Sequence, residues 1–189
     1  VAYNTGSSRG GVLGASVTVF RPGPIYETTI YQPTGTGKKV NAGDMAIGGV
    51  YALKLTDKFS FSTRVSWVHQ TLYTQSLNAV SVDLGTLFHT GFKSLRLAMA
   101  LKNFGPDKTL QDTKFFMPVY YNVALAGEVY GEKGGPAYLT VSGESAYAAD
   151  YELRGHVGAE MWRKNAFALR AGYKFNYDTD TFSLGAGLK

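Results

Sequence analysis

The chain has 189 residues, enough for one domain of ordinary size, and it has no cysteine, which excludes disulfides and thiolate metal sites. Charged residues make up only 17% of the sequence, while tyrosine and glycine are abundant. This composition is typical of a β-protein with tight turns and with tyrosines at boundaries between water and apolar surroundings. The net charge is +5, but lysine and arginine are scattered along the chain, so no basic cluster indicates nucleic-acid binding.

Alternation of apolar and polar residues predicts β-strands along most of the chain. The clearest case is FSFSTRVSWVHQ, residues 59–70, where Phe61, Val65 and Trp67 share one face and Arg64 and several serines share the other. This segment is longer than an average globular strand and reaches the roughly 9–11 residues that a membrane-spanning strand needs. After a loop at 1–10, we expect about ten strands, at 11–21, 43–55, 59–70, 78–89, 94–102, 118–130, 137–147, 151–162, 166–176 and 181–188.

Short turns join most of these strands, and no segment predicts a helix, so the expected fold is an all-β antiparallel up-and-down meander. Longer polar connections are expected at 22–42, 72–78 and 103–117, the first with a short strand near 26–31. Periodicity alone does not distinguish a soluble barrel or sandwich, whose apolar face points inward, from a transmembrane barrel, whose apolar face meets lipid.

Three features favour the transmembrane barrel. The strands are long, aromatic residues gather near the strand ends as in interfacial girdles, and the polar face mixes small residues with charges of both signs. A hydrated lumen accommodates such a balanced set, whereas a solvent-facing surface usually carries more lysine and glutamate. The expected lumen-facing charged network comprises Arg64, Asp83, Arg96, Glu128, Glu144, Glu152, Arg154, Glu160, Arg170 and Lys174.

No motif predicts catalysis or a cofactor. The glycine-rich tract at 35–39 lacks the first glycine of a phosphate-binding loop, and Lys39 stands where serine or threonine would meet magnesium. His69, His89 and His156 fall on separate strands without metal-ligand spacing. Carboxylates on neighbouring strands are expected to pair with arginines rather than to act as acid and base. The sequence therefore favours a protein that is not an enzyme and has no catalytic, cofactor-binding or metal site.

Several segments in order resemble the PorV/PorQ family of outer-membrane barrels, relatives of the FadL-type fatty-acid transporters. These segments are GDMAIGGVYALKLTDKFSFSTRV, SVDLGTLFHTG, LRLAMALKNFG, the strand after Pro118, and RGHVGAEMWRKNAFALRAGYKF. The resemblance covers about residues 25–189 and implies a bacterial outer-membrane barrel of about fourteen strands. Family members are longer at both ends, so the resemblance also implies that residues 1–189 form a single barrel domain that is incomplete at its N- and C-termini.

The resemblance implies a protein that handles or anchors secreted protein cargo, as in type IX secretion, with outer-membrane lipid and protein as its partners. Two alternatives remain open: a FadL-like channel for hydrophobic small molecules, and a structural subunit of a larger outer-membrane or surface assembly. The long connections would carry recognition of a partner. Candidate contact residues there are Tyr26, Tyr31, Tyr73, Phe115, Phe116 and Tyr120.

Overall fold

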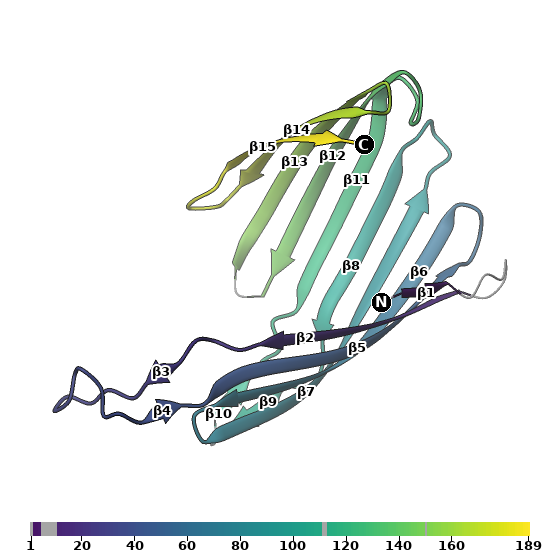
Figure 1. Cartoon of the computed structure of the whole chain (residues 1–189). Helices are drawn as coiled ribbons and strands as arrows, with labels where there is room; N and C mark the ends of the chain where they lie inside the picture. The colour runs from purple at the N-terminus through teal and green to yellow at the C-terminus, as the bar shows by residue number, and fades with distance from the viewer. Residues whose placement is uncertain (1, 5–10, 111–112, 150) are drawn as a thin grey trace. The chain divides into compact units, whose positions relative to one another are not determined.

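The computed structural model describes residues 2–4, 11–110, 113–149 and 151–189, and these residues form strands and turns but no helix (Figure 1). Hence none of the described segments is a helix long and apolar enough to cross a membrane. The strands are β1 (Ala2–Asn4), β2 (Val12–Phe20), β3 (Ile25–Tyr26), β4 (Lys39–Val40), β5 (Ala42–Lys54), β6 (Phe59–Leu72), β7 (Gln75–His89), β8 (Arg96–Phe104), β9 (Lys108–Leu110), β10 (Thr113–Phe115), β11 (Tyr120–Tyr130), β12 (Ala137–Ala148), β13 (Tyr151–Arg163), β14 (Phe167–Phe175) and β15 (Phe182–Leu188).

The long strands follow one another in a single sheet whose order is β1-β2-β5-β6-β7-β8-β11-β12-β13-β14-β15. Sequence neighbours are sheet neighbours, apart from the short hairpins β3–β4 and β9–β10, which form two-stranded sheets of their own. The prediction of an all-β antiparallel meander with about ten long strands is confirmed. Among the described strands the order begins at β1 and ends at β15, so this sheet is not closed on itself.

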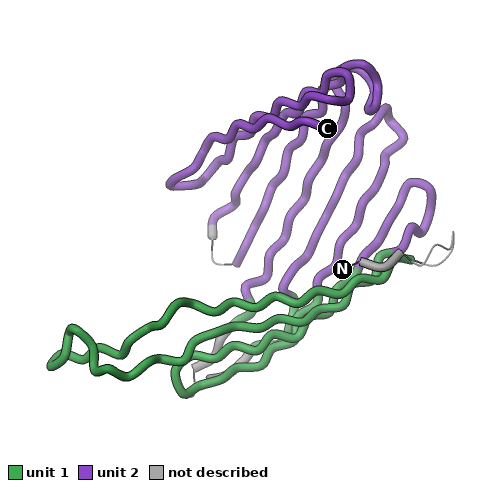
Figure 2. The backbone as a smooth tube through the Cα atoms, viewed as in Figure 1, with its two compact units in different colours: residues 1–52, 63–82, 104–117 green, residues 53–62, 83–103, 118–189 purple. Residues whose placement is uncertain are grey.

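The chain divides into two compact units, coloured separately in Figure 2. Unit 1 comprises residues 1–52, 63–82 and 104–117, and it holds β2, both short hairpins and parts of β5, β6 and β7. Unit 2 comprises residues 53–62, 83–103 and 118–189, and it holds the continuous antiparallel ladder from β8 through β11 to β15.

Three of the predicted loops are wrong. The loop expected at 1–10 contains the short strand β1, which pairs with β2. The connection expected at 72–78 is only the turn at Tyr73 and Thr74, because Leu72 still belongs to β6 and β7 begins at Gln75. Tyr73 takes a left-handed backbone conformation with φ of 58°, which allows so short a turn. The connection at 103–117 contains the hairpin β9–β10, although its residues are mostly polar and lack a clear alternation.

Both units bury their polar face and expose their apolar face. In unit 2 the most buried side chains are Tyr138, Ala146 and Ala168, and their cross-strand partners place all three on the face that carries the charges. In unit 1 the most buried side chains, Ser66, Ala79 and Ser81, are small or polar as well. No large side chain is fully buried in the part of the chain that the structure describes.

The opposite face is aliphatic in the middle of the strands and is open. Leu125, Val157 and Leu169 are 52%, 47% and 67% exposed in unit 2, and Val17 and Val65 are similarly open in unit 1. A water-soluble sheet would bury such residues, because covering one leucine or valine is worth about 1.5–3 kcal/mol. The distribution of burial is thus the reverse of that in a soluble sandwich.

Candidate functional site

The polar face of unit 2 is held together by cross-strand contacts between charged side chains. Arg96 at the start of β8 donates from Nη1 to both carboxylate oxygens of Glu128 near the end of β11, at 3.1 and 3.2 Å. Thr140 of β12 donates to the same carboxylate at 3.1 Å, and the Glu128 backbone amide donates to the Ser94 hydroxyl at 2.8 Å. The Glu128 side chain is only 3% exposed, so these partners, rather than water, stabilise its negative charge.

A second pair lies on the next two strands of the same face. Glu160 of β13 and Arg170 of β14 are direct cross-strand partners, and Arg170 Nε donates to Glu160 Oε2. The Trp162 indole donates to the other Glu160 oxygen, and the Arg170 guanidinium lies 5.8 Å from the Trp162 ring centre. Both charged side chains are more open than Glu128, at 35% and 45% exposure.

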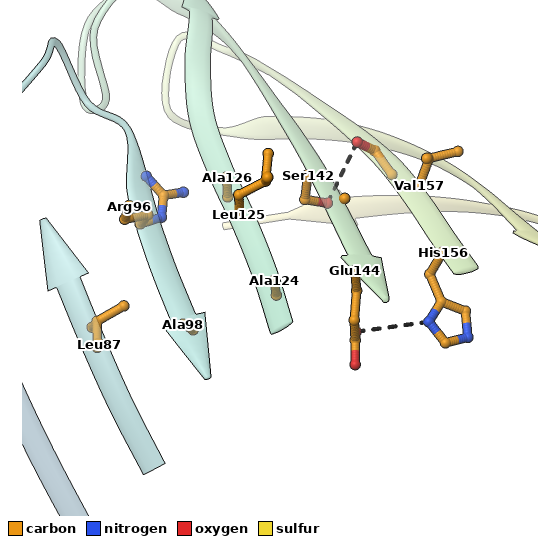
Figure 3. Close-up of a pocket in the computed structure, with 12 residues that line it drawn as sticks. Leu87, Arg96, Ala98, Ala124, Leu125, Ala126, Ser142, Glu144, His156 and Val157 are labelled. Carbon is orange, nitrogen blue, oxygen red and sulfur yellow. Dashed lines mark hydrogen bonds and ion pairs between the residues drawn. The ribbon is translucent and has the colours of Figure 1, made fainter. Parts of the chain in front are cut away.

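A third cluster crosses four strands around Tyr177. Asn122 donates to Glu144 at 2.8 Å, and Glu144 stands 3.8 Å from Nδ1 of His156, its direct cross-strand partner (Figure 3). The other His156 nitrogen lies 2.9 Å from the Tyr177 hydroxyl. Tyr177 belongs to the turn after β14, so this turn is tied to the polar face.

Two further cations lie over the Tyr177 ring. The Arg154 guanidinium is 4.4 Å and the Lys174 ammonium 5.5 Å from the ring centre. Such cation–π contacts keep the charges close to the sheet. The sequence does not reveal the role of Tyr177, because its position in a turn gives no sign that its ring reaches back over β13 and β14.

A depression of about 300 Å³ opens on the polar face of unit 2. Small residues of β8, β11 and β13, including Ala98, Ala124 and Gly158, line it (Figure 3). Arg96, Glu144 and His156 also line it, and all three are already engaged with other side chains. The described residues contain no group of three or more histidines and carboxylates able to hold a metal ion.

The remaining expected members of the charged network lie outside these clusters. Arg64 of β6 donates to the Ser16 hydroxyl of β2 at 2.9 Å. Its side chain passes over Gly48 of the intervening strand β5. A Cβ atom at Gly48 would lie 2.8 Å from the arginine Nε. Asp83 of β7 accepts a hydrogen bond of 2.8 Å from the backbone amide of Asn103, whose φ is 59°. Glu152 is exposed and takes part in none of these contacts.

The Asp83 contact joins two of the segments that carry the family resemblance. Asp83 belongs to the Asp-Leu-Gly segment and Asn103 to the Asn-Phe-Gly segment. Asn103 also donates from its side chain to the Pro118 carbonyl at 3.2 Å. Gly105 lies so close to β7 that a Cβ atom there would stand 2.4 Å from the Val80 carbonyl oxygen, so only glycine fits.

In unit 1, the connection between β2 and β5 is fastened by a chain of hydrogen bonds. Lys38 donates from Nζ to the Tyr73 hydroxyl at 3.0 Å, and Tyr73 donates to Glu27 at 3.2 Å. The hydrogen bond to Tyr73, with a further contribution from the Glu27 charge, raises the pKa of Lys38. Thr36 donates to the second oxygen of Glu27 at 3.1 Å. This clamp of Lys38, Tyr73 and Glu27 cannot be read from the sequence, because it joins two separate connections.

The candidate contact residues occupy different settings. Tyr31 is 93% exposed and Phe116 is 72% exposed, whereas Tyr26 is half-exposed beside the Lys39 ammonium, and Tyr73 belongs to the clamp. Tyr120 is the first residue of β11 rather than a loop residue, and the Lys102 ammonium lies 5.6 Å from its ring centre. Phe115 ends β10, and its side chain lies outside the described part of the chain.

The chain matches no protein-family model and no curated protein sequence.

Proposed function

We propose that the chain supplies strands to a bacterial outer-membrane β-barrel of PorV/PorQ type, which is not an enzyme and which handles or anchors secreted protein cargo. One observation carries the membrane part of this proposal: the sheet exposes aliphatic residues and partly buries its charges. Leu169 is 67% exposed while the Glu128 side chain is 3% exposed. In lipid this arrangement costs nothing on the apolar face and keeps the charges in a hydrated lumen.

The arrangement of aromatic residues in unit 2 supports the same proposal. On the apolar face of β11, Tyr121 lies near the start and Tyr130 at the end, with Val123 and Leu125 between them. A β-bulge between Glu128 and Tyr130 leaves eight regular residue steps between the two tyrosines, roughly 26 Å, which becomes roughly 20 Å across a barrel wall tilted by about 40°. This height approaches the apolar band of about 25 Å in outer-membrane barrels.

The cargo part of the proposal rests on the connections of unit 1. The connections 21–41, 73–74 and 105–119 all follow strands that run in the same direction, so the topology places them at one end of the strands. Tyr31 and Phe116 are open there, and exposed aromatic side chains are enriched in surfaces that bind proteins. The clamp holds the longest of these connections in a fixed conformation, which lowers the entropic cost of binding.

Site-specific photo-crosslinking tests the proposal. A photoreactive phenylalanine analogue replaces Tyr31 in one variant and Phe92 in the other. Phe92 is 70% exposed, against 93% for Tyr31, and lies in the turn between β7 and β8 at the opposite end of the strands. We expect the protein to stay in the membrane fraction after an alkaline wash and to crosslink a secreted protein from position 31 only. Release from the membrane without detergent would overturn the membrane assignment. Retention without a secreted partner would overturn the cargo role and favour a structural subunit.

A FadL-like channel for hydrophobic small molecules is the second candidate, and the depression lined by Ala98, Ala124 and Gly158 favours it. Its apolar floor offers contact to a short aliphatic group, while Arg96 and Glu144 would flank the group. Native mass spectrometry of the detergent-purified protein distinguishes the two candidates. A bound lipid or fatty acid that is lost on Ala124→Trp substitution would support the channel.

A further inference from the structure

The turns at one end of the strands in unit 2 concentrate basic residues, although these residues are scattered in the sequence. The turns are 55–58, 90–95, 131–136 and 164–166, and each follows a strand that runs toward the same end of the sheet. Apart from Arg96, which is paired with Glu128, seven basic residues and two acidic residues, Asp57 and Glu132, lie in or beside them. We call the basic set the turn rim; its members are Lys54, Lys58, Lys93, Lys133, Arg163, Lys164 and Lys189.

Contacts between neighbouring turns tie several parts of the turn rim together. The amide of His89 donates to the Lys58 carbonyl at 2.8 Å, which joins the first two turns. The amide of Lys164 donates to the Pro136 carbonyl at 2.6 Å, and that of Lys189 to the Ala166 carbonyl at 2.9 Å. In Figure 2 these turns follow one another along one edge of the purple tube.

The charges of the turn rim are mostly not used inside the protein. All seven residues are exposed, and only Lys54 forms an ion pair with a described residue, with Asp57 at 3.2 Å. The turn at 176–181, at the other end of the strands in unit 2, has the opposite charge, with Asp178 and Asp180 and no basic residue. Arg154 and Lys174 lie over the Tyr177 ring of this turn, so its two acidic residues have basic neighbours, whereas basic residues predominate in the turn rim.

A belt of open apolar side chains borders the turn rim. Leu55, Phe92, Val129, Phe167 and Leu188 lie at the same strand ends and are all more than half exposed. Lys93 lies next to this belt, with its ammonium 6.0 Å from the Phe92 ring centre. A free anion or a nucleic acid would engage the cations and leave this belt in water. A lipid with an anionic headgroup covers both, with phosphate on the cations and acyl chain on the belt.

We infer that the turn rim is a binding surface for anionic glycerophospholipid headgroups. The inference rests on the proposed membrane-barrel function and adds to it an orientation: this end of unit 2 faces the leaflet surface richer in anionic phospholipid, and the acidic turn 176–181 faces away from it. The attraction of one lysine to an anionic lipid surface changes the lipid affinity about fivefold, and added salt screens this attraction.

Electron paramagnetic resonance with spin-labelled lipids tests the inference on the reconstituted full-length protein. The measured quantity is the association constant of spin-labelled phosphatidylglycerol relative to phosphatidylcholine. The rim variant combines Lys58→Gln, Lys93→Gln and Lys133→Gln. A matched control, Arg21→Gln with Lys39→Gln and Lys102→Gln, removes the same charge from positions outside the turn rim. We expect a preference for phosphatidylglycerol of at least about fivefold in the wild type and the control at low salt. The rim variant, which keeps four of the seven basic residues, should lose most of it.

Three results would overturn the inference. The first is an unchanged preference in the rim variant, and the second is an equal loss in the control. The third is loss of the wild-type preference when inorganic phosphate is added at constant ionic strength, because a site for free phosphate would then explain the binding. Flotation with pure phosphatidylcholine vesicles separates the two proposals: a protein that does not float has no membrane barrel, whereas one that floats without lipid preference lacks only the headgroup surface.

Discussion

Glu128 is the most deeply buried carboxylate among the charged pairs of the polar face, and its environment makes a quantitative prediction. Replacing Arg96 with alanine removes the two hydrogen bonds that balance this charge and leaves only the neutral hydroxyls of Thr140 and Ser94 nearby. Breaking a buried pair is costly because one charge remains without a partner. We expect Arg96→Ala to lower the free energy of unfolding by about 3 kcal/mol, measured by denaturant titration in lipid vesicles.

The pair of Glu160 and Arg170 provides the matched control. Its side chains are 35% and 45% exposed, so water screens the attraction and solvates whichever charge remains. Arg170→Ala should therefore cost about 1 kcal/mol or less in the same titration. Equal losses in the two variants would contradict the interpretation that burial, rather than the ion pair itself, sets the effect.

Gly48 makes a second prediction at the scale of one residue. A Cβ atom at this position would lie 2.7 Å from the Ser66 hydroxyl and 2.8 Å from Arg64 Nε, so a side chain there displaces Arg64 from Ser16. Gly49, the next residue on the opposite face, has open space around it. We expect Gly48→Val to lower stability by about 1–3 kcal/mol and Gly49→Val to leave it nearly unchanged in thermal unfolding. A similar effect of both substitutions would mean that strand propensity, rather than the crossing arginine, decides the outcome.

Among the elements, the connection between β2 and β5 depends on a single aromatic residue. Tyr73→Phe removes the hydroxyl that links Lys38 to Glu27, so the connection should open more often and limited proteolysis after Lys38 should accelerate severalfold. Tyr26→Phe is the control, because the aromatic ring beside Lys39 is kept. Equal cleavage rates for both variants would show that the hairpin β3–β4 holds the connection without the clamp.

The same clamp predicts a pH dependence. The pKa of Lys38 is higher in the folded chain than in the unfolded chain. Protonated Lys38 therefore stabilises the folded connection fully at any pH below its unfolded pKa. This stabilisation is lost as the pH rises through its folded pKa. Cleavage of residues 25–41 by an alkali-tolerant protease should therefore accelerate in strongly alkaline solution and stay constant between pH 6 and 9. A rise in cleavage within that neutral range would contradict the assignment to lysine.

The elements were largely predictable because alternation is a local signal. Clear two-residue periodicity at 59–70 and 94–102 predicts β6 and β8, and the turn residues beside them fix their ends to within about two residues. The hairpin β9–β10 was missed because three-residue strands contain too few positions for a period to emerge. The turn after β6 was predicted too long because polar residues at 74–76 resemble a loop although the strand resumes there.

At the scale of the whole molecule, the sequence predicts which face each charge occupies but not which charges meet. Arg96 and Glu128 are 32 residues apart, and their contact depends on the register between β8 and β11, which a shift of two residues would change without altering either face. Tyr177 reaches His156 only because of the turn between β14 and β15. The turn rim likewise emerges only when the antiparallel order brings distant turns to one end.

The exposed apolar face yields the prediction that separates a membrane barrel from a soluble sheet. Leu125 is half exposed and lies midway along β11, between Tyr121 and Val129, so in a bilayer it faces the hydrocarbon. A lysine there should lower the free energy of unfolding in phospholipid vesicles by about 2–4 kcal/mol. Phe92→Lys, in a turn at the strand ends, should cost about 1 kcal/mol or less, because charge penalties fall toward the interface.

In a soluble protein Leu125→Lys at an open site would change stability by only about 0.5 kcal/mol and would improve solubility. Denaturant titrations of both variants in vesicles therefore decide which solvent the apolar face meets.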